Sequence, residues 1–98
     1  MKNNKIRQTY TIFKVYVDGR YERCTHSTLT RQLEHLLCFD IPKFIETGKE
    51  TAITFYGSIE GYYYCDHSRK RGGVFPGHDF NKFLDFIQDY DKQCHRVD

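Results

Sequence analysis

The sequence has no long hydrophobic run, and in its 98 residues no segment approaches the length of a membrane span. Its first residues, MKNNKIRQTYTIF, are polar and basic and lack the apolar stretch of a signal peptide. We therefore expect a cytoplasmic protein that does not enter a membrane. The four cysteines are then expected to be reduced thiols or metal ligands rather than disulfides; they are Cys24, Cys38, Cys65 and Cys94.

A large excess of charge of one sign is also absent. Fifteen Lys and Arg residues against thirteen Asp and Glu give a net charge of +2, well short of the basic balance typical of dedicated nucleic-acid-binding proteins. The charge is unevenly spread, because residues 1–31 hold seven Lys or Arg and only two Asp or Glu. The N-terminal hairpin and the segment 69–71 are the basic ends, which permits an acidic partner.

Recognisable catalytic motifs are missing. The sequence contains no Gly-rich phosphate loop, no HExxH pattern and no carboxylate pair at a recognisable spacing. Cys65, Asp66 and His67 supply the residue types of a nucleophile and its base. Neighbouring residues on a strand point to opposite faces, however, so Asp66 would face away from both neighbours. We expect no catalytic residues, no cofactor and no enzymatic activity.

Aromatic residues are abundant: the chain has eight Tyr and eight Phe, and 39% of its residues are hydrophobic. This content is too high for a disordered chain, and the length suits one domain with one core. We expect an α+β fold, with a single small domain over 1–98. In it, two successive ββα units form an approximately four-stranded, largely antiparallel sheet, with the helices packed on one face.

The first unit is predicted to open with a hairpin over 9–26, after a polar, frayed start at 1–8. The stretch TYTIFKVYV is rich in β-branched and aromatic residues, and the DG that follows it is a strong hairpin signal. Phe13, Val15 and Val17 share one face of the strand by its period of two. That face is expected to be core.

Two helices are predicted after this hairpin. The leucine spacing of STLTRQLEHLL indicates a helix over 28–38. A second helix is predicted over 41–47, where Asp40 is a suitable N-cap and Gly48 can end the helix in a left-handed conformation.

The second unit is predicted to repeat the pattern. A hairpin over 51–67 would join TAITFYGSI to YYYCDH, and a basic loop punctuated by Gly and Pro would follow over 68–77. The last element is a helix over 79–94 with apolar residues at helical spacing and Asp79 as its cap.

Two Cys-x-His pairs stand 41 residues apart, one in each hairpin: Cys24 with His26, and Cys65 with His67. The repeated Cys-x-His motif is compatible with an internal duplication or with coincidence. Residues two apart on a strand share a face, so two such pairs could complete a Cys₂His₂ zinc site if the hairpins meet. The spacing does not match the usual structural zinc site, and the alternative is small buried cysteines beside exposed histidines.

With the helices on one side, the other sheet face would be open and would carry tyrosines with basic neighbours. Such residues stack on single-stranded bases or anchor a protein partner, and the basic loop can add contacts to phosphate or carboxylate groups. The alternatives are a dimer interface or a second hydrophobic layer, and for the loop a solvated turn. The residues predicted to bind a partner are Tyr10, Lys14, Tyr16, Tyr62, Tyr64, Arg69, Lys70 and Arg71.

In size and composition the chain resembles the small accessory proteins made by phages and mobile elements, including anti-CRISPR-like inhibitors of host defence nucleases. The resemblance implies a non-catalytic binding protein that blocks a protein or ribonucleoprotein surface by steric occlusion. A nucleic-acid-binding module and a small zinc-binding domain are the alternative functions, and a homodimer is left open.

Overall fold

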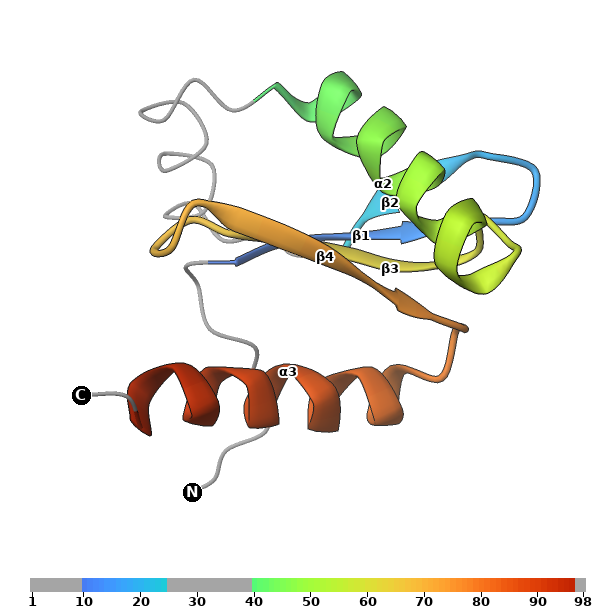
Figure 1. The fold of residues 1–98 in the computed structure, drawn as a ribbon. Helices are drawn as coiled ribbons and strands as arrows, with labels where there is room; N and C mark the ends of the chain where they lie inside the picture. The colour runs from blue at the N-terminus through green and yellow to red at the C-terminus, as the bar shows by residue number, and fades with distance from the viewer. Residues whose placement is uncertain (1–9, 25–39, 97–98) are drawn as a thin grey trace.

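The computed structural model describes residues 10–24 and 40–96. The predicted frayed start at 1–8 and the predicted helix at 28–38 lie outside the described residues. No helix in the described part is long and apolar enough to cross a membrane. The elements are, in chain order, β1 (Tyr10–Val15), β2 (Tyr21–Arg23), α2 (Ile41–Tyr56), β3 (Gly61–Asp66), β4 (Arg71–Pro76) and α3 (Phe80–Arg96) (Figure 1).

The four strands form one antiparallel sheet in the order β2-β1-β3-β4. Val15 lies opposite Tyr21 of β2 and opposite Gly61 of β3, and Gly61 in turn lies opposite Pro76 of β4. Strands β1 and β3 are therefore central, and β2 and β4 are the two edges. The predicted α+β class with a four-stranded antiparallel sheet is confirmed. The element order agrees only roughly, because the second hairpin is built from other residues than expected.

The first hairpin forms where the DG dipeptide predicts it. The backbone N–H of Tyr16 donates to the carbonyl of Arg20, and that of Gly19 donates to the carbonyl of Tyr16, both at 2.8 Å. Gly19 has a φ of 92°, in the region that favours glycine. Because β1 ends at Val15, Val17 lies in the turn and is 70% exposed, although it was expected to be core.

Helix α2 continues past Gly48 to Tyr56, so the prediction of a helix over 41–47 followed by a strand is wrong. The helix begins as expected, since the side chain of Asp40 accepts the backbone N–H of Lys43 at 3.0 Å. It ends at Gly57, whose φ is 72°.

Packing explains why α2 does not stop at Gly48. Gly48 is buried within the helix and faces the ring of Tyr63, where it allows α2 to approach β3 closely. About one turn before Gly48 and one turn after it, Ile45 and Ala52 are also buried. The helical stripe that these residues form outweighs the strand preference of the β-branched residues at 51–54.

The predicted hairpin over 51–67 does not form, because residues 51–56 belong to α2. Strand β4 occupies most of the segment predicted to be a basic loop over 68–77. Strand β3 pairs instead with β4, and the pair Asp66–Arg71 closes a turn of four residues. The predicted helix over 79–94 corresponds to α3, and the side chain of Asp79 accepts the backbone N–H of Lys82 at 3.2 Å.

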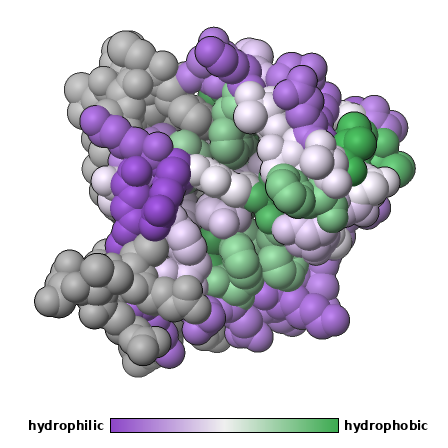
Figure 2. All heavy atoms as spheres, in the orientation of Figure 1, coloured by the Kyte–Doolittle hydropathy of each residue, from purple (hydrophilic) through white to green (hydrophobic). Residues whose placement is uncertain are grey.

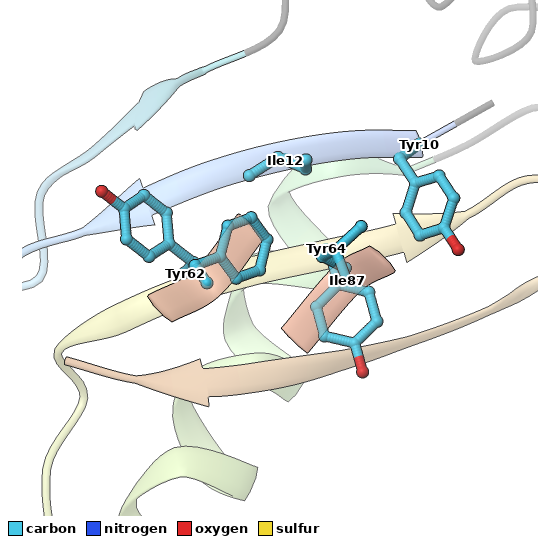
Figure 3. Close-up of a cluster of buried hydrophobic side chains, with 6 residues drawn as sticks. Tyr10, Ile12, Tyr62, Tyr64 and Ile87 are labelled. Carbon is cyan, nitrogen blue, oxygen red and sulfur yellow. The ribbon is translucent and has the colours of Figure 1, made fainter. Parts of the chain in front are cut away.

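The helices α2 and α3 lie on opposite faces of the sheet, so the expectation of both on one face is wrong (Figure 1). The α2 face buries Phe13, Val15, Ile45, Ala52 and Tyr63. The α3 face buries a second, more aromatic core made of Tyr10, Ile12, Tyr62, Tyr64, Phe83 and Ile87 (Figure 3). Both sets of alternating strand residues are large and apolar, so both faces need a cover.

Candidate functional site

The tyrosines that were expected on an open sheet face lie under α3. Tyr10 is fully buried, and Tyr62 and Tyr64 are 3% and 7% exposed. Tyr62 stacks on Phe83 of α3, with ring centroids 4.7 Å apart. The expectation of an open tyrosine face is therefore wrong, because in this structure these three rings belong to a second core.

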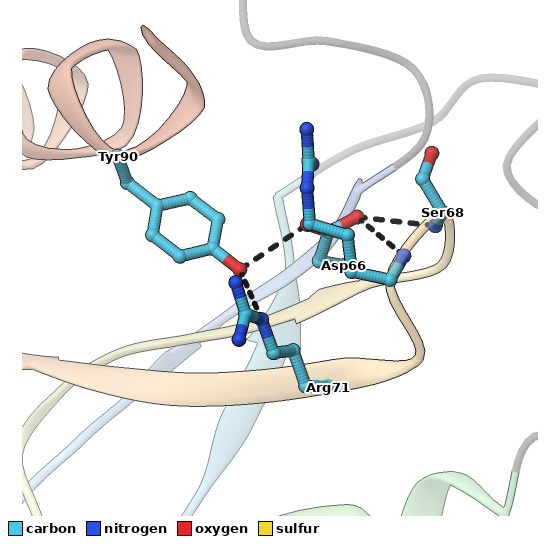
Figure 4. A network of polar contacts seen from close by, with 5 residues as sticks. Asp66, Ser68, Arg71 and Tyr90 are labelled. Atoms are coloured by element: carbon cyan, nitrogen blue, oxygen red, sulfur yellow. Dashed lines mark hydrogen bonds and ion pairs between the residues drawn. The ribbon is translucent and has the colours of Figure 1, made fainter. Parts of the chain in front are cut away.

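The three basic residues at 69–71 also differ from the expectation of a loose, basic loop. Asp66 is fully buried and receives Arg69 Nη1 at 2.8 Å on Oδ2. Its Oδ1 accepts the backbone N–H groups of Ser68 and Arg69 at 3.1 and 3.3 Å (Figure 4). Arg71 Nε donates to the hydroxyl of Tyr90 at 3.0 Å, and that hydroxyl donates to Asp66 Oδ2 at 3.2 Å.

Two of the three basic side chains thus hold the β3–β4 turn together. Lys70 lies at the tip of this turn, is exposed, and has a φ of 54°. Arg71 is exposed overall, and its guanidinium nevertheless lies 5.7 Å from the centroid of the Tyr90 ring. The cluster is best explained as the anchor of the turn to α3.

Among the candidate zinc ligands that the structure describes, Cys24 is not brought together with Cys65 and His67. Cys24 packs in the core on the α3 face, whereas Cys65 alternates with Tyr64 on β3 and shares the α2 face with Tyr63. The sheet therefore separates the two thiols. His67 Nε2 lies 2.6 Å from the hydroxyl oxygen of Thr11, and His26 lies outside the described residues.

The described residues contain no group of three His, Cys, Asp or Glu that could hold a metal ion. Burial raises the pKa of the Cys24 thiol, which keeps it protonated. The first Cys-x-His motif follows an edge strand, β2, and the second begins in a central strand, β3. The two copies of the motif are therefore not equivalent in the fold.

Tyr16 and Lys14 are the predicted residues that remain partly exposed on the first hairpin. Lys14 Nζ and the guanidinium of Arg20 lie 5.5 and 4.7 Å from the centroid of the Tyr16 ring, and its hydroxyl donates to Glu22 Oε1 at 2.7 Å. That bond to Glu22 raises the pKa of Tyr16. The ring of Tyr16 is therefore already flanked by the hairpin's own cations.

The charges of this hairpin also pair with one another. Arg20 Nε donates to Asp18 Oδ2 at 2.8 Å, and this bond lowers the pKa of Asp18 and raises that of Arg20. The hairpin consequently carries oriented but largely compensated charge.

Beside this hairpin, a groove of about 620 Å³ runs between the edge strand β2 and helix α2. Tyr21 lies on one wall, 41% exposed, and its ring packs against Phe13 with centroids 5.7 Å apart. Pro42 and Ile45 line the α2 wall. An aromatic wall facing aliphatic residues is the usual lining of a pocket that binds a side chain or a small ligand.

The charges around the groove cancel. Its lining holds two cations and two anions, Arg20, Lys49, Glu22 and Glu46. Lys49 Nζ lies 3.9 Å from Glu46 Oε1, a loose pair whose carboxylate is largely exposed. The groove therefore offers little net charge to attract a polyanion.

Sequence reasoning missed this groove because it is formed by two segments distant in the chain. Tyr21, Pro42, Ile45, Glu46 and Lys49 belong to β2 and α2, and only the packing of α2 on the sheet brings them together. One signal was present in the sequence: a hairpin closed at DG places Tyr21 opposite Val15 and on the face of Phe13. Comparison of the chain with protein-family models, curated proteins and solved structures gives no match.

Proposed function

We propose that the protein is a non-catalytic binding protein that occupies the surface of another protein. The groove between β2 and α2 and the hairpin tip beside it would make the contact. The observation that carries the proposal is the groove itself, with a half-exposed tyrosine on its wall and Val17 exposed on the adjoining turn. Tyrosine is enriched among the residues that dominate binding energy at protein interfaces.

The cancellation of charge favours a protein over a nucleic acid as the partner. Binding to nucleic acid depends on cations that replace counterions on phosphates. At the groove each cation has an anion close by, and at the β3–β4 turn Arg69 is paired with Asp66. A polypeptide segment with an apolar side chain and flanking polar groups matches this surface better.

The mechanism would be steric, as in inhibitors of host defence nucleases made by phages. A small rigid domain that fills a site on its target prevents a substrate or a second protein from using that site. The stiffness comes from the two cores, which hold the β2 edge and α2 on either side of the groove.

The test is affinity capture from host cells, with Tyr21→Asp compared with wild type. We expect the variant to lose at least about tenfold in affinity, because it puts a charge where an aromatic anchor is needed. Phe80→Asp is a matched control, since Phe80 is 43% exposed and Tyr21 41%, and Phe80 lies at the start of α3. Circular dichroism checks that both variants fold.

Nuclease treatment and a salt titration separate the alternative functions. A protein partner should be captured after nuclease treatment, and its affinity should change little with salt. Capture that requires nucleic acid, with affinity falling steeply as salt rises, would establish nucleic-acid binding instead. An equal affinity of wild type and Tyr21→Asp for the captured protein would refute the groove as the site.

A further inference from the structure

The two edge strands of the sheet differ in how well they are protected from pairing with another chain. Strand β2 has three residues, two of them charged. Strand β4 has six, and after Arg71 its sequence GGVFP carries no charge. Natural proteins protect exposed edges by short strands, charges or proline. The centre of β4 has none of these protections.

The backbone of β4 presents hydrogen-bonding groups at this edge. The carbonyl of Phe75 lies against Gly61 of β3, and the carbonyl of Tyr64 lies against Gly72. These contacts identify Tyr62–Phe75 and Tyr64–Gly73 as the pairs that bond across β3 and β4. At the alternate positions, Gly72 and Val74, the N–H and C=O groups therefore point away from β3. Pro76, which has no N–H, occupies a third such position.

Apolar side chains border the β4 edge on both sides. In Figure 1 this edge faces the viewer, with α2 above it and α3 below. Figure 2 shows hydrophobic side chains gathered over the C-terminal part of α2 and between β4 and α3. On α2, Phe55 is 73% exposed and lies on the same helical face as Phe44, whose ring lies close to Gly72 of β4. Phe75 of β4 and Phe86 of α3 are half-buried between the sheet and α3.

We propose that β4 pairs antiparallel with β4 of a second copy of this chain, which joins two sheets into one. In the register centred on Val74, Val74 of each copy exchanges N–H and C=O bonds with Val74 of the other. The N–H of Gly72 donates to the carbonyl of Pro76 in the second copy, so the missing N–H of Pro76 costs only one bond at each end. The apolar side chains beside β4 on the α2 face of one copy then lie next to those on the α2 face of the other, and the same holds on the α3 face.

A second copy fits this edge better than an unrelated peptide because the edge is self-complementary. In this register no charged residue of one β4 strand lies opposite a charged residue of the other. Arg71 lies opposite Gly77, and the two Arg71 residues stand six positions, about 20 Å, apart. A net charge of +2 per chain adds little repulsion.

This dimer is independent of the proposed function, because β4 and the groove lie at opposite edges of the sheet. A dimer would present two grooves. The two proposals can therefore fail separately: Tyr21→Asp should leave the dimer intact, and a variant at the β4 edge should leave each groove able to bind.

The test is sedimentation equilibrium of the full chain across a range of concentrations. We expect wild type to approach twice the 11.8 kDa chain mass, and Phe55→Lys to raise the dissociation constant at least about tenfold by placing a charge in the border. Val17→Lys is the matched control, since Val17 is 70% exposed and lies on the turn beside the other edge. It should dimerise as wild type does.

Amide hydrogen exchange locates the interface. In wild type, protection of the Gly72 and Val74 amides should rise with protein concentration, and in Phe55→Lys it should not. A wild type that stays monomeric at every concentration overturns the proposal and leaves β4 open to another polypeptide. A dimer that survives Phe55→Lys, with Gly72 and Val74 exchanging equally fast at all concentrations, overturns it as well.

Discussion

At the scale of single residues, Gly48 determines how closely helix and sheet approach. It lies inside α2, where glycine costs about 1 kcal/mol of helix stability relative to alanine. A Cβ atom built at this position would lie 2.6 Å from Cδ2 of Tyr63. Tyr63 cannot move aside, because it is fully buried and its hydroxyl donates to the carbonyl of Ile59 at 2.6 Å.

We therefore expect Gly48→Ala to lower the free energy of unfolding by about 1–3 kcal/mol, against the helix preference of alanine. Urea denaturation measures the change. Thr47→Ala, at the neighbouring exposed position, should instead leave stability unchanged or raise it slightly. If both variants were equally stable, the close contact with Tyr63 would not be a constraint.

The same residue illustrates what the sequence could and could not predict. Local preferences favour a helix end at Gly48, because glycine often follows the last helical residue, and a strand over TAITF, because this segment contains β-branched and aromatic residues. The competing signal was the spacing of Ile41, Ile45, Gly48 and Ala52, which continues one helical face through both segments. Only the presence of Tyr63 opposite this face shows that a glycine belongs to it.

At the scale of elements, the β3–β4 hairpin depends on glycines and on a buried carboxylate. The residues RGGVFP resemble a loop because Gly and Pro are usually depleted in strands. In the fold, Gly72 and Gly73 lie against the backbone and the ring of Tyr64, where side chains would collide. The strand was therefore not predictable from β-propensity, whereas the hairpin at DG, which follows the usual turn chemistry, was.

Asp66 is the residue on which the turn of this hairpin depends. We expect Asp66→Asn to lower the free energy of unfolding by about 2–3 kcal/mol, because asparagine keeps an oxygen for the turn amides but loses the charge that pairs with Arg69. Ser68→Ala is the control in chemical denaturation, since the recorded bond from Ser68 uses its backbone N–H, and its cost should stay within about 0.5 kcal/mol. A variant at position 66 as stable as Ser68→Ala would contradict this account.

At the scale of the whole molecule, the candidate surfaces could not be predicted because the sheet has two covered faces. Strand alternation correctly separated Tyr62 and Tyr64 from Tyr63, but it cannot say whether a helix covers either face. Once α3 covers the tyrosine face, the surfaces that we propose for partners, among the described residues, are the two sheet edges, with the groove at β2 and the apolar border at β4. The interaction surfaces then depend on contacts distant in sequence.

The two tyrosine-containing cores give the molecule a predictable response to high pH. Burial raises the pKa of both Tyr63 and Tyr64 from 10.0 to about 12. Between those pH values the native state holds a proton that the unfolded chain has lost, so the free energy of unfolding falls as pH rises through this window. Below pH 10 the contribution is fully present.

Tyr64→Phe tests this response by removing one of the two groups. At pH 11 we expect its decline in unfolding free energy, relative to neutral pH, to be about 1.4 kcal/mol smaller than that of wild type, which corresponds to a tenfold change in the equilibrium constant. Tyr63→Phe should show the same alkaline gain but should also lose about 1 kcal/mol at neutral pH, because its hydroxyl bonds to Ile59. Urea denaturation followed by circular dichroism at each pH gives these values. If wild type and both variants declined in parallel from pH 10 to pH 12, ionisation of the buried tyrosines would not be what destabilises the protein in alkali.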